Sequence, residues 1–88
     1  MRPEMNEVNV IKRFILRALM AAYPTPLPGE ALDAAVRTGV NPRPLMSDVE
    51  LAKRDLEARG MIVGTRDPVD DSVSWALTPA GVIQAKPL

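Results

Sequence analysis

Residues 47–81 decide the fold of this chain, and their sequence is SDVELAKRDLEARGMIVGTRDPVDDSVSWALTPAG. Before Gly60 the apolar residues recur with the period of an α-helix, and after it they alternate with the period of a β-strand. Glycine readily adopts the left-handed conformation that ends a helix, so Gly60 lets the chain pass directly from helix to strand. Thr78-Pro79 has the pattern of a helix cap followed by a first-turn proline. The stretch therefore predicts a helix, a β-hairpin and a short closing helix.

The helix before Gly60 is expected to span residues 44–59. Ser47 and Glu50 have the spacing of a capping box, in which the two side chains satisfy each other's backbone N–H groups. One inward stripe, stepping by four, three and four residues, consists of Leu45, Val49, Ala52 and Leu56. A solvated face of mixed charge is expected for Lys53, Arg54, Asp55 and Glu57.

The hairpin is expected over residues 61–77, with a loop of about five residues between its strands. In the returning strand, alternation places Val73, Trp75 and Leu77 on one face, where they can close the core. The turn carries three aspartates whose spacing does not fit a calcium-binding loop, so a solvated turn is expected there. The closing helix is expected over residues 79–85.

A first helix is expected over residues 9–22, after a loose lead-in of residues 1–8. Asn6 or Asn9 can cap this helix, because a short side-chain oxygen accepts a hydrogen bond from an unpaired backbone N–H. Tyr23-Pro24 ends it, since proline disfavours the helical conformation in the residue before it. Its buried stripe consists of Val8, Ile11, Ile15, Ala18, Leu19 and Ala22.

Three prolines between residues 24 and 28 predict an extended connector, in which Leu27 can touch the core. A second helix is expected over residues 28–38, with Pro28 in its first turn and Gly39 as its left-handed C-cap. Residues 40–44 then form the turn that leads into the third helix.

The composition argues against several classes of protein. The chain has 88 residues, which is the length of one domain, and its net charge is zero. It contains neither Cys nor His, which removes the commonest nucleophile–base pairs and metal ligands, so neither an enzyme nor a cofactor is expected. No apolar run approaches the ~20 residues that span a bilayer, and the N-terminus lacks the pattern of a secretory signal. We therefore expect a cytoplasmic protein with no membrane partner.

Two short motifs resemble a known family. Residues Leu56 to Ile62, LEARGMI, resemble the "L-E-x-x-G-L-I" junction that closes the recognition helix of many bacterial and phage winged-helix regulators. Residues 76–81, ALTPAG, resemble the "L-T-x-x-G" that follows the wing in those proteins. The resemblance covers roughly residues 9–85. The pattern and size are also similar to those of the small winged-helix proteins of Mu-like phages and prophages.

The resemblance implies one domain over residues 1–88, of the α+β, mostly α class. Its fold would be a winged helix-turn-helix with a three-helix core, a β-hairpin wing and a short C-terminal helix. It also implies a transcription regulator whose third helix enters the major groove of double-stranded DNA, with the wing alongside. In that position Arg54 can read guanine and Ser47 can hold a phosphate. The implied DNA-binding residues are Arg43, Ser47, Leu51, Arg54 and Arg66. A phosphate-contacting surface or an ordinary solvated flank can be formed by Lys12, Arg13, Arg17, Arg37 and Arg43.

The charge of the same segment supports an alternative function. Between Ser47 and Ser74 there are four basic and seven acidic residues, whereas DNA affinity comes largely from cationic contacts to phosphate. A winged-helix module that binds a protein and not DNA is therefore the alternative. Three apolar residues lie outside the main stripe of the first helix: Phe14, Leu16 and Met20. They form a homodimer seam, or the wing or the closing helix covers them.

Overall fold

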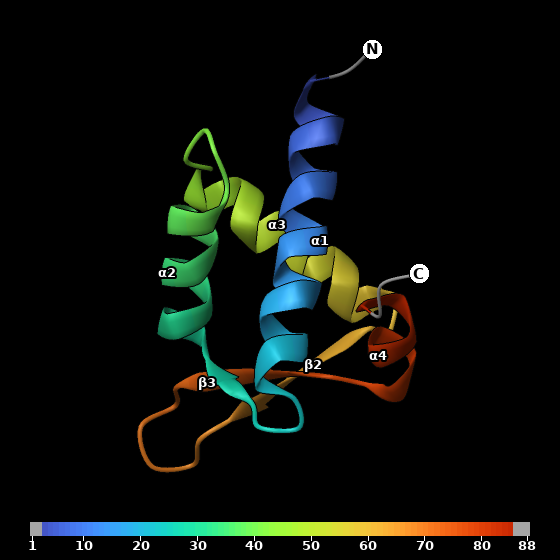
Figure 1. Ribbon diagram of the computed structural model, residues 1–88. Helices are drawn as coiled ribbons and strands as arrows, with labels where there is room; N and C mark the ends of the chain where they lie inside the picture. The colour runs from blue at the N-terminus through green and yellow to red at the C-terminus, as the bar shows by residue number, and fades with distance from the viewer. Residues whose placement is uncertain (1–2, 86–88) are drawn as a thin grey trace.

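The computed structural model describes residues 3–85, with side chains from Val8 onward. The protein belongs to the α+β class and is mostly helical. In chain order its elements are α1 (Pro3–Ala22), β1 (Leu27–Pro28), α2 (Gly29–Gly39), α3 (Met46–Ala58), β2 (Ile62–Arg66), β3 (Val73–Leu77) and α4 (Pro79–Ala85) (Figure 1). Each helix and hairpin strand expected from the sequence is present, and the arrangement is compatible with a winged helix.

The sheet has three antiparallel strands in the order β1-β3-β2. The predicted hairpin is confirmed, with Ile62 opposite Leu77 and Arg66 opposite Val73. The expected connector contributes the third strand, because Leu27 pairs with Trp75 across the other edge of β3. The sequence did not predict this pairing, since a two-residue strand between prolines leaves no alternation to detect.

The core lies around α1, which contacts the other three helices and β3 (Figure 1). Leu27 and Trp75 pack against this core, as expected from the sequence. The buried apolar side chains are Ile11, Ile15, Leu16, Leu19, Leu32, Val36, Val49, Ala52, Leu56, Ile62 and Leu77.

The beginning of α1 differs from the prediction. The helix begins at Pro3, so a loose lead-in over residues 1–8 is wrong for the described residues 3–8, while residues 1–2 lie outside them. Asn6 and Asn9 consequently lie within the helix and do not cap it. Proline suits the first helical turn because its missing N–H has no helical partner there.

The beginning of α3 also differs. The helix begins at Met46, with Leu45 as its N-cap residue and no side-chain hydrogen bond at the cap, so the predicted capping box is wrong. The carbonyl of Leu45 accepts hydrogen bonds from the backbone N–H groups of Asp48 and Val49. Because Leu45 precedes the helix it does not follow the helical period, and its side chain is 67% exposed instead of buried.

The two glycines expected to end helices behave differently. Gly60 adopts the predicted left-handed conformation, with a φ of 75°. Gly39 does not, because it is the last residue of α2, and the cap residue is Val40 in an extended conformation. A Cβ on Gly39 would overlap the ring of Phe14, so here glycine permits the close approach of α1 and α2.

The predicted restart at Thr78 is confirmed. Its Oγ1 accepts a hydrogen bond from the backbone N–H of Gly81 at 3.1 Å, which is the contact of an N-cap residue. The same hydroxyl donates to the carbonyl of Gly60. A Cβ on Gly81 would overlap the carbonyl of Met61, so α4 packs closely against the junction between α3 and β2. The two sequence motifs therefore meet in space.

Candidate nucleic-acid interface

Lys53 fixes α3 to two other parts of the chain. Its side chain is only 6% exposed, so the expectation that it lies on a solvated face is wrong. Its Nζ donates a hydrogen bond to Oδ1 of Asp33 in α2 at 2.9 Å and lies 3.1 Å from Oε2 of Glu50. The same ammonium group lies 5.6 Å from the centroid of the Trp75 ring, within the range of a cation–π interaction.

Asp55 fixes the other side of α3 to α1. Its carboxylate forms ion pairs with Lys12 of α1 and with Arg59, where Nε of Arg59 lies 3.0 Å from Oδ2. Hydrogen bonds from Lys12 and then from Arg59 hold the pKa of Asp55 below its ordinary value of 3.8. Lys12 is therefore directed at this carboxylate and not at a phosphate-contacting surface.

These contacts show that two acidic residues of α3 form ion pairs within the chain. Glu50 and Asp55 contributed to the acidic excess seen in the sequence, but each forms an ion pair with a cation of the same chain. Their charges are partly compensated inside the protein. Two of the four basic residues of the same segment, Lys53 and Arg59, form these ion pairs, so five acidic and two basic residues of the segment remain and its acidic excess is unchanged.

The residues expected to contact DNA from α3 share one exposed face. Ser47, Leu51 and Arg54 are all exposed, and their spacing of four and three residues places them on the same side of the helix. Arg43, in the turn before α3, is also exposed. The exposure expected for these residues is thus present, whereas the anchoring of α3 through Lys53 was not predicted.

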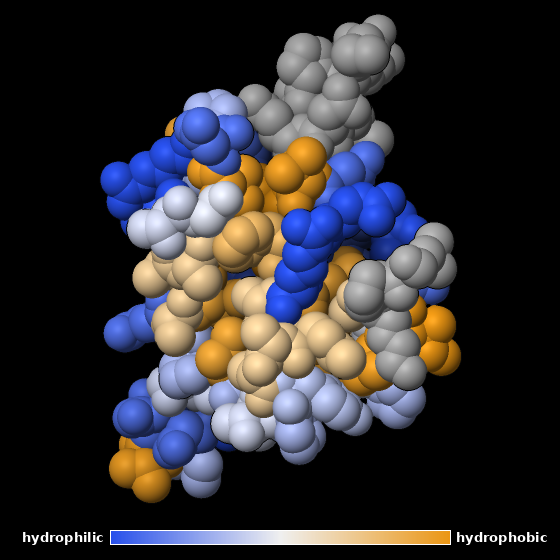
Figure 2. Space-filling model, viewed as in Figure 1, coloured by the Kyte–Doolittle hydropathy of each residue, from blue (hydrophilic) through white to orange (hydrophobic). Residues whose placement is uncertain are grey.

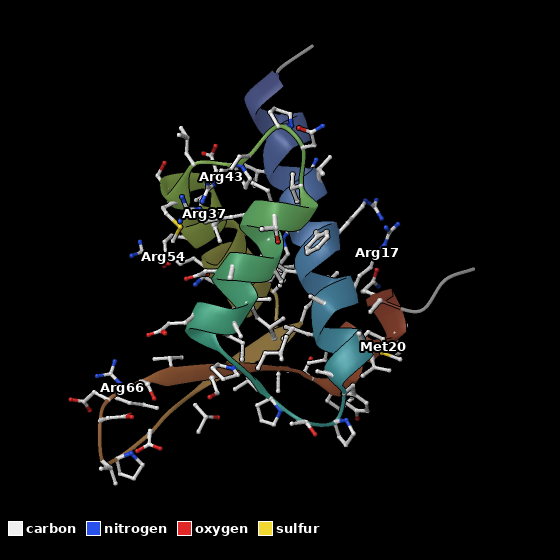
Figure 3. All side chains as sticks on the ribbon, turned by 60° about the vertical axis from the view of Figure 1, so that its left-hand side comes forward. Arg17, Met20, Arg37, Arg43, Arg54 and Arg66 are labelled. Carbon is white, nitrogen blue, oxygen red and sulfur yellow. The ribbon has the colours of Figure 1, made fainter. Side chains whose placement is uncertain are left out.

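Four arginines lie toward one side of the molecule in Figure 3. Arg37 comes from the last turn of α2, Arg43 from the turn, Arg54 from α3 and Arg66 from the end of β2. Arg17, on α1, lies on the opposite side in the same view. The basic residues grouped from the sequence are thus divided among different surfaces.

The turn between β2 and β3, residues 67–72 (the wing turn), uses its acidic side chains to hold its own backbone. Oδ1 of Asp67 accepts hydrogen bonds from the backbone N–H of Val69 at 2.7 Å and of Asp70 at 3.4 Å. Oδ1 of Asp70 accepts one from the backbone N–H of Ser72 at 2.9 Å. Hydrogen bonding from the Ser72 side chain, and next from its backbone, holds the pKa of Asp70 below its ordinary value. Arg66 precedes this turn and is exposed. The neighbouring carboxylates of Asp67 and Asp70 accept the backbone hydrogen bonds given above.

The residues considered for a homodimer seam contact other parts of the same chain. Leu16 is buried in the core, and Phe14 and Met20 pack against it while partly exposed. The Phe14 ring lies against Gly39 of α2. Leu16 is therefore unavailable to a second copy, whereas Phe14 and Met20 remain partly exposed.

Comparison with family models, curated proteins and solved structures finds no match to this chain. The described part of the chain also contains no helix with the length and apolar character needed to cross a membrane. The structure itself shows a mostly helical α+β domain with a three-stranded antiparallel sheet.

Proposed function

We propose that this chain is a winged-helix DNA-binding protein that acts in the cytoplasm as a transcription regulator of bacterial or phage origin. In this proposal α3 enters the major groove of double-stranded DNA, and the β2–β3 hairpin lies alongside as the wing. The supporting observation is the group Arg37, Arg43, Arg54 and Arg66, which reaches from the helix-turn-helix to the wing on one side of Figure 3. We refer to these four residues as the arginine row.

The exposed face of α3 suits a groove containing bases and phosphates. Arg54 can donate two hydrogen bonds to a guanine edge, and Leu51 can contact a thymine methyl group. Ser47 lies in the first turn of α3, where its hydroxyl and the helix N-terminus favour a phosphate. Arg43 and Arg66 flank this face and would contact the phosphates on either side.

Salt dependence tests this proposal. Fluorescence anisotropy with a random-sequence duplex should show affinity that falls steeply as the salt concentration rises, because bound arginines release counterions. If the arginine row contacts about four phosphates, the log–log slope is about −3 to −4. Absence of duplex binding even at low salt would overturn the proposal.

Single variants identify the surface. Arg43→Ala or Arg54→Ala should weaken binding, and Arg43→Ala should also reduce the salt slope by about one. Arg17→Ala is the matched control, since it removes the same charge from the opposite side of Figure 3. Equal losses from Arg17→Ala and Arg43→Ala would show that binding follows net charge and not the proposed face.

A protein-binding module without DNA affinity is the second candidate. It is favoured by exposed apolar side chains just before α3 and near its middle, because Leu45 is 67% and Leu51 is 54% exposed. Leu51→Asp should then abolish binding to a specific protein partner that the Arg54→Ala variant still binds. Duplex binding with the expected salt slope, together with a partner that binds Leu51→Asp normally, would reject this candidate.

A further inference from the structure

A hollow lies between α1 and the turn that joins α2 to α3. Its volume is about 290 Å³, and its walls include Val10, Ile11, Val40 and Leu45. Ile11 is only 1% exposed and forms part of the core, whereas Val10 and Leu45 are 52% and 67% exposed. Figure 2 shows apolar surface in this region, between the upper part of α1 and the turn after α2.

Two opposite charges also line this hollow. Arg43 belongs to the turn, and Asp48 belongs to the first turn of α3. No ion pair joins either group to another described side chain, and the ion pairs of α3 involve Glu50, Lys53 and Asp55 instead. The hollow therefore combines apolar walls with a cation and an anion that are not neutralised by each other.

We infer that this hollow binds a free α-amino acid with a large apolar side chain. The apolar side chain would contact Val10, Val40 and Leu45, since removal of apolar surface from water favours such contacts. The ligand carboxylate would accept hydrogen bonds from Arg43, and its ammonium group would donate to Asp48. A purely anionic ligand would meet repulsion from Asp48, and a purely cationic one would meet repulsion from Arg43, so the pair of charges selects a zwitterion.

The size of the hollow agrees with this class of ligand. Small-molecule sites usually start at about 300 Å³, so this hollow is suited to a molecule of about a dozen heavy atoms. For a ligand of this size in an open site, a Kd on the order of 0.1–1 mM is expected.

Phenylalanine and three analogues test the inference on the full chain without DNA. In a titration followed by two-dimensional ¹H–¹⁵N NMR, phenylalanine should shift the amide signals of Val10, Val40, Leu45 and Asp48 saturably. 3-Phenylpropanoate lacks the ammonium group and 2-phenylethylamine lacks the carboxylate, so each should bind about tenfold more weakly. Alanine, which keeps both charges without the ring, should produce no saturable shift.

Two variants test which protein side chain contacts each charged group of the ligand. With Asp48→Asn, phenylalanine should lose its advantage over 3-phenylpropanoate, and with Arg43→Gln it should lose its advantage over 2-phenylethylamine. A general structural effect would weaken all ligands together and would leave these ratios unchanged. The inference is overturned if phenylalanine causes no saturable shift, if 3-phenylpropanoate binds the wild type as tightly as phenylalanine, or if the ratios are unchanged in both variants. None of these outcomes depends on DNA binding, so the proposed function is tested separately.

Discussion

Lys53 joins α3, α2 and the sheet through a single ammonium group. Its Nζ contacts Asp33 and Glu50 and lies near the Trp75 ring, and Lys53 is buried, as are Ala52 and Leu56 on the same helix. Burying a cation is unfavourable unless it is paired, and here two carboxylates and an aromatic face provide partners. Lys53 thus helps to hold α3 against α2 and the sheet, although the charge of a lysine usually places it in solvent.

Replacing this lysine should destabilise the protein. We expect Lys53→Ala to lower the free energy of unfolding by about 1–3 kcal/mol, because Asp33 loses its partner and the buried methylene chain is removed. Lys53→Met should lose less, since methionine retains most of the apolar packing. Urea denaturation measures both, with Arg54→Ala as an exposed control on the same helix. If Lys53→Ala and Arg54→Ala unfold at the same urea concentration, Lys53 has no special structural role.

At the level of elements, the wing turn and α3 both use carboxylates for internal contacts. Asp67 and Asp70 hold the turn after β2, and Asp55 holds α3 to α1. These acidic residues stabilise α3, which carries Arg54, and the turn that follows Arg66. Their negative charge would also weaken the DNA contact that we propose for the arginine row.

Asparagine separates these two effects in the wing. In the double variant Asp67→Asn, Asp70→Asn, the amide oxygens can still accept the backbone hydrogen bonds, but two negative charges near Arg66 are removed. If the wing lies alongside DNA, we expect duplex affinity to rise about two- to tenfold at low salt. Fluorescence anisotropy measures the change, and urea denaturation verifies that stability is preserved. An unchanged affinity in a stably folded variant would remove the wing from the proposed interface.

Acid should loosen the attachment of α3 to α1. Because Lys12 and Arg59 lower the folded-state pKa of Asp55 below 3.8, its ionised form contributes stability above that value. This contribution is lost as the pH falls below about 4 and through the folded-state pKa, where Asp55 becomes protonated. We expect Asp55→Asn to be less stable than the wild type near pH 7 and to lose less stability on acidification. Urea titrations at neutral pH and near pH 3 measure this, and parallel pH profiles would contradict it.

At the scale of the whole molecule, the structural features that could be predicted from the sequence are those that depend on residues close together in the chain. The helix stripes, the left-handed Gly60, the hairpin and the Thr78 cap all depend on neighbouring residues, and the structure contains them. The pairing of β1 with β3 and the burial of Lys53 depend on partners far away in the chain, and the sequence did not predict them. Positions 49, 52, 53 and 56 do follow a helical stripe, but the charge of Lys53 indicated solvent.

The same long-range contacts predict cooperative unfolding. Trp75, the single tryptophan, belongs to the sheet but packs against the core built on α1. Since helices and sheet share that core, we expect one two-state transition. Tryptophan fluorescence and helical circular dichroism should therefore give coincident urea curves. A tryptophan transition at lower urea would show that the sheet unfolds separately.

The wing turn has a consequence for how this protein can diverge. Residues 67–72 close on themselves, because the backbone N–H of Asp67 donates to the carbonyl of Ser72 and that of Asp71 to the carbonyl of Asp67, while Val69 is 92% exposed. Exposed turns that do not contribute to the core tolerate insertions and deletions. Insertions or deletions in descendants of this chain can therefore change the length of the turn and how far the hairpin extends. The core around α1 can be selected for stability independently of these changes.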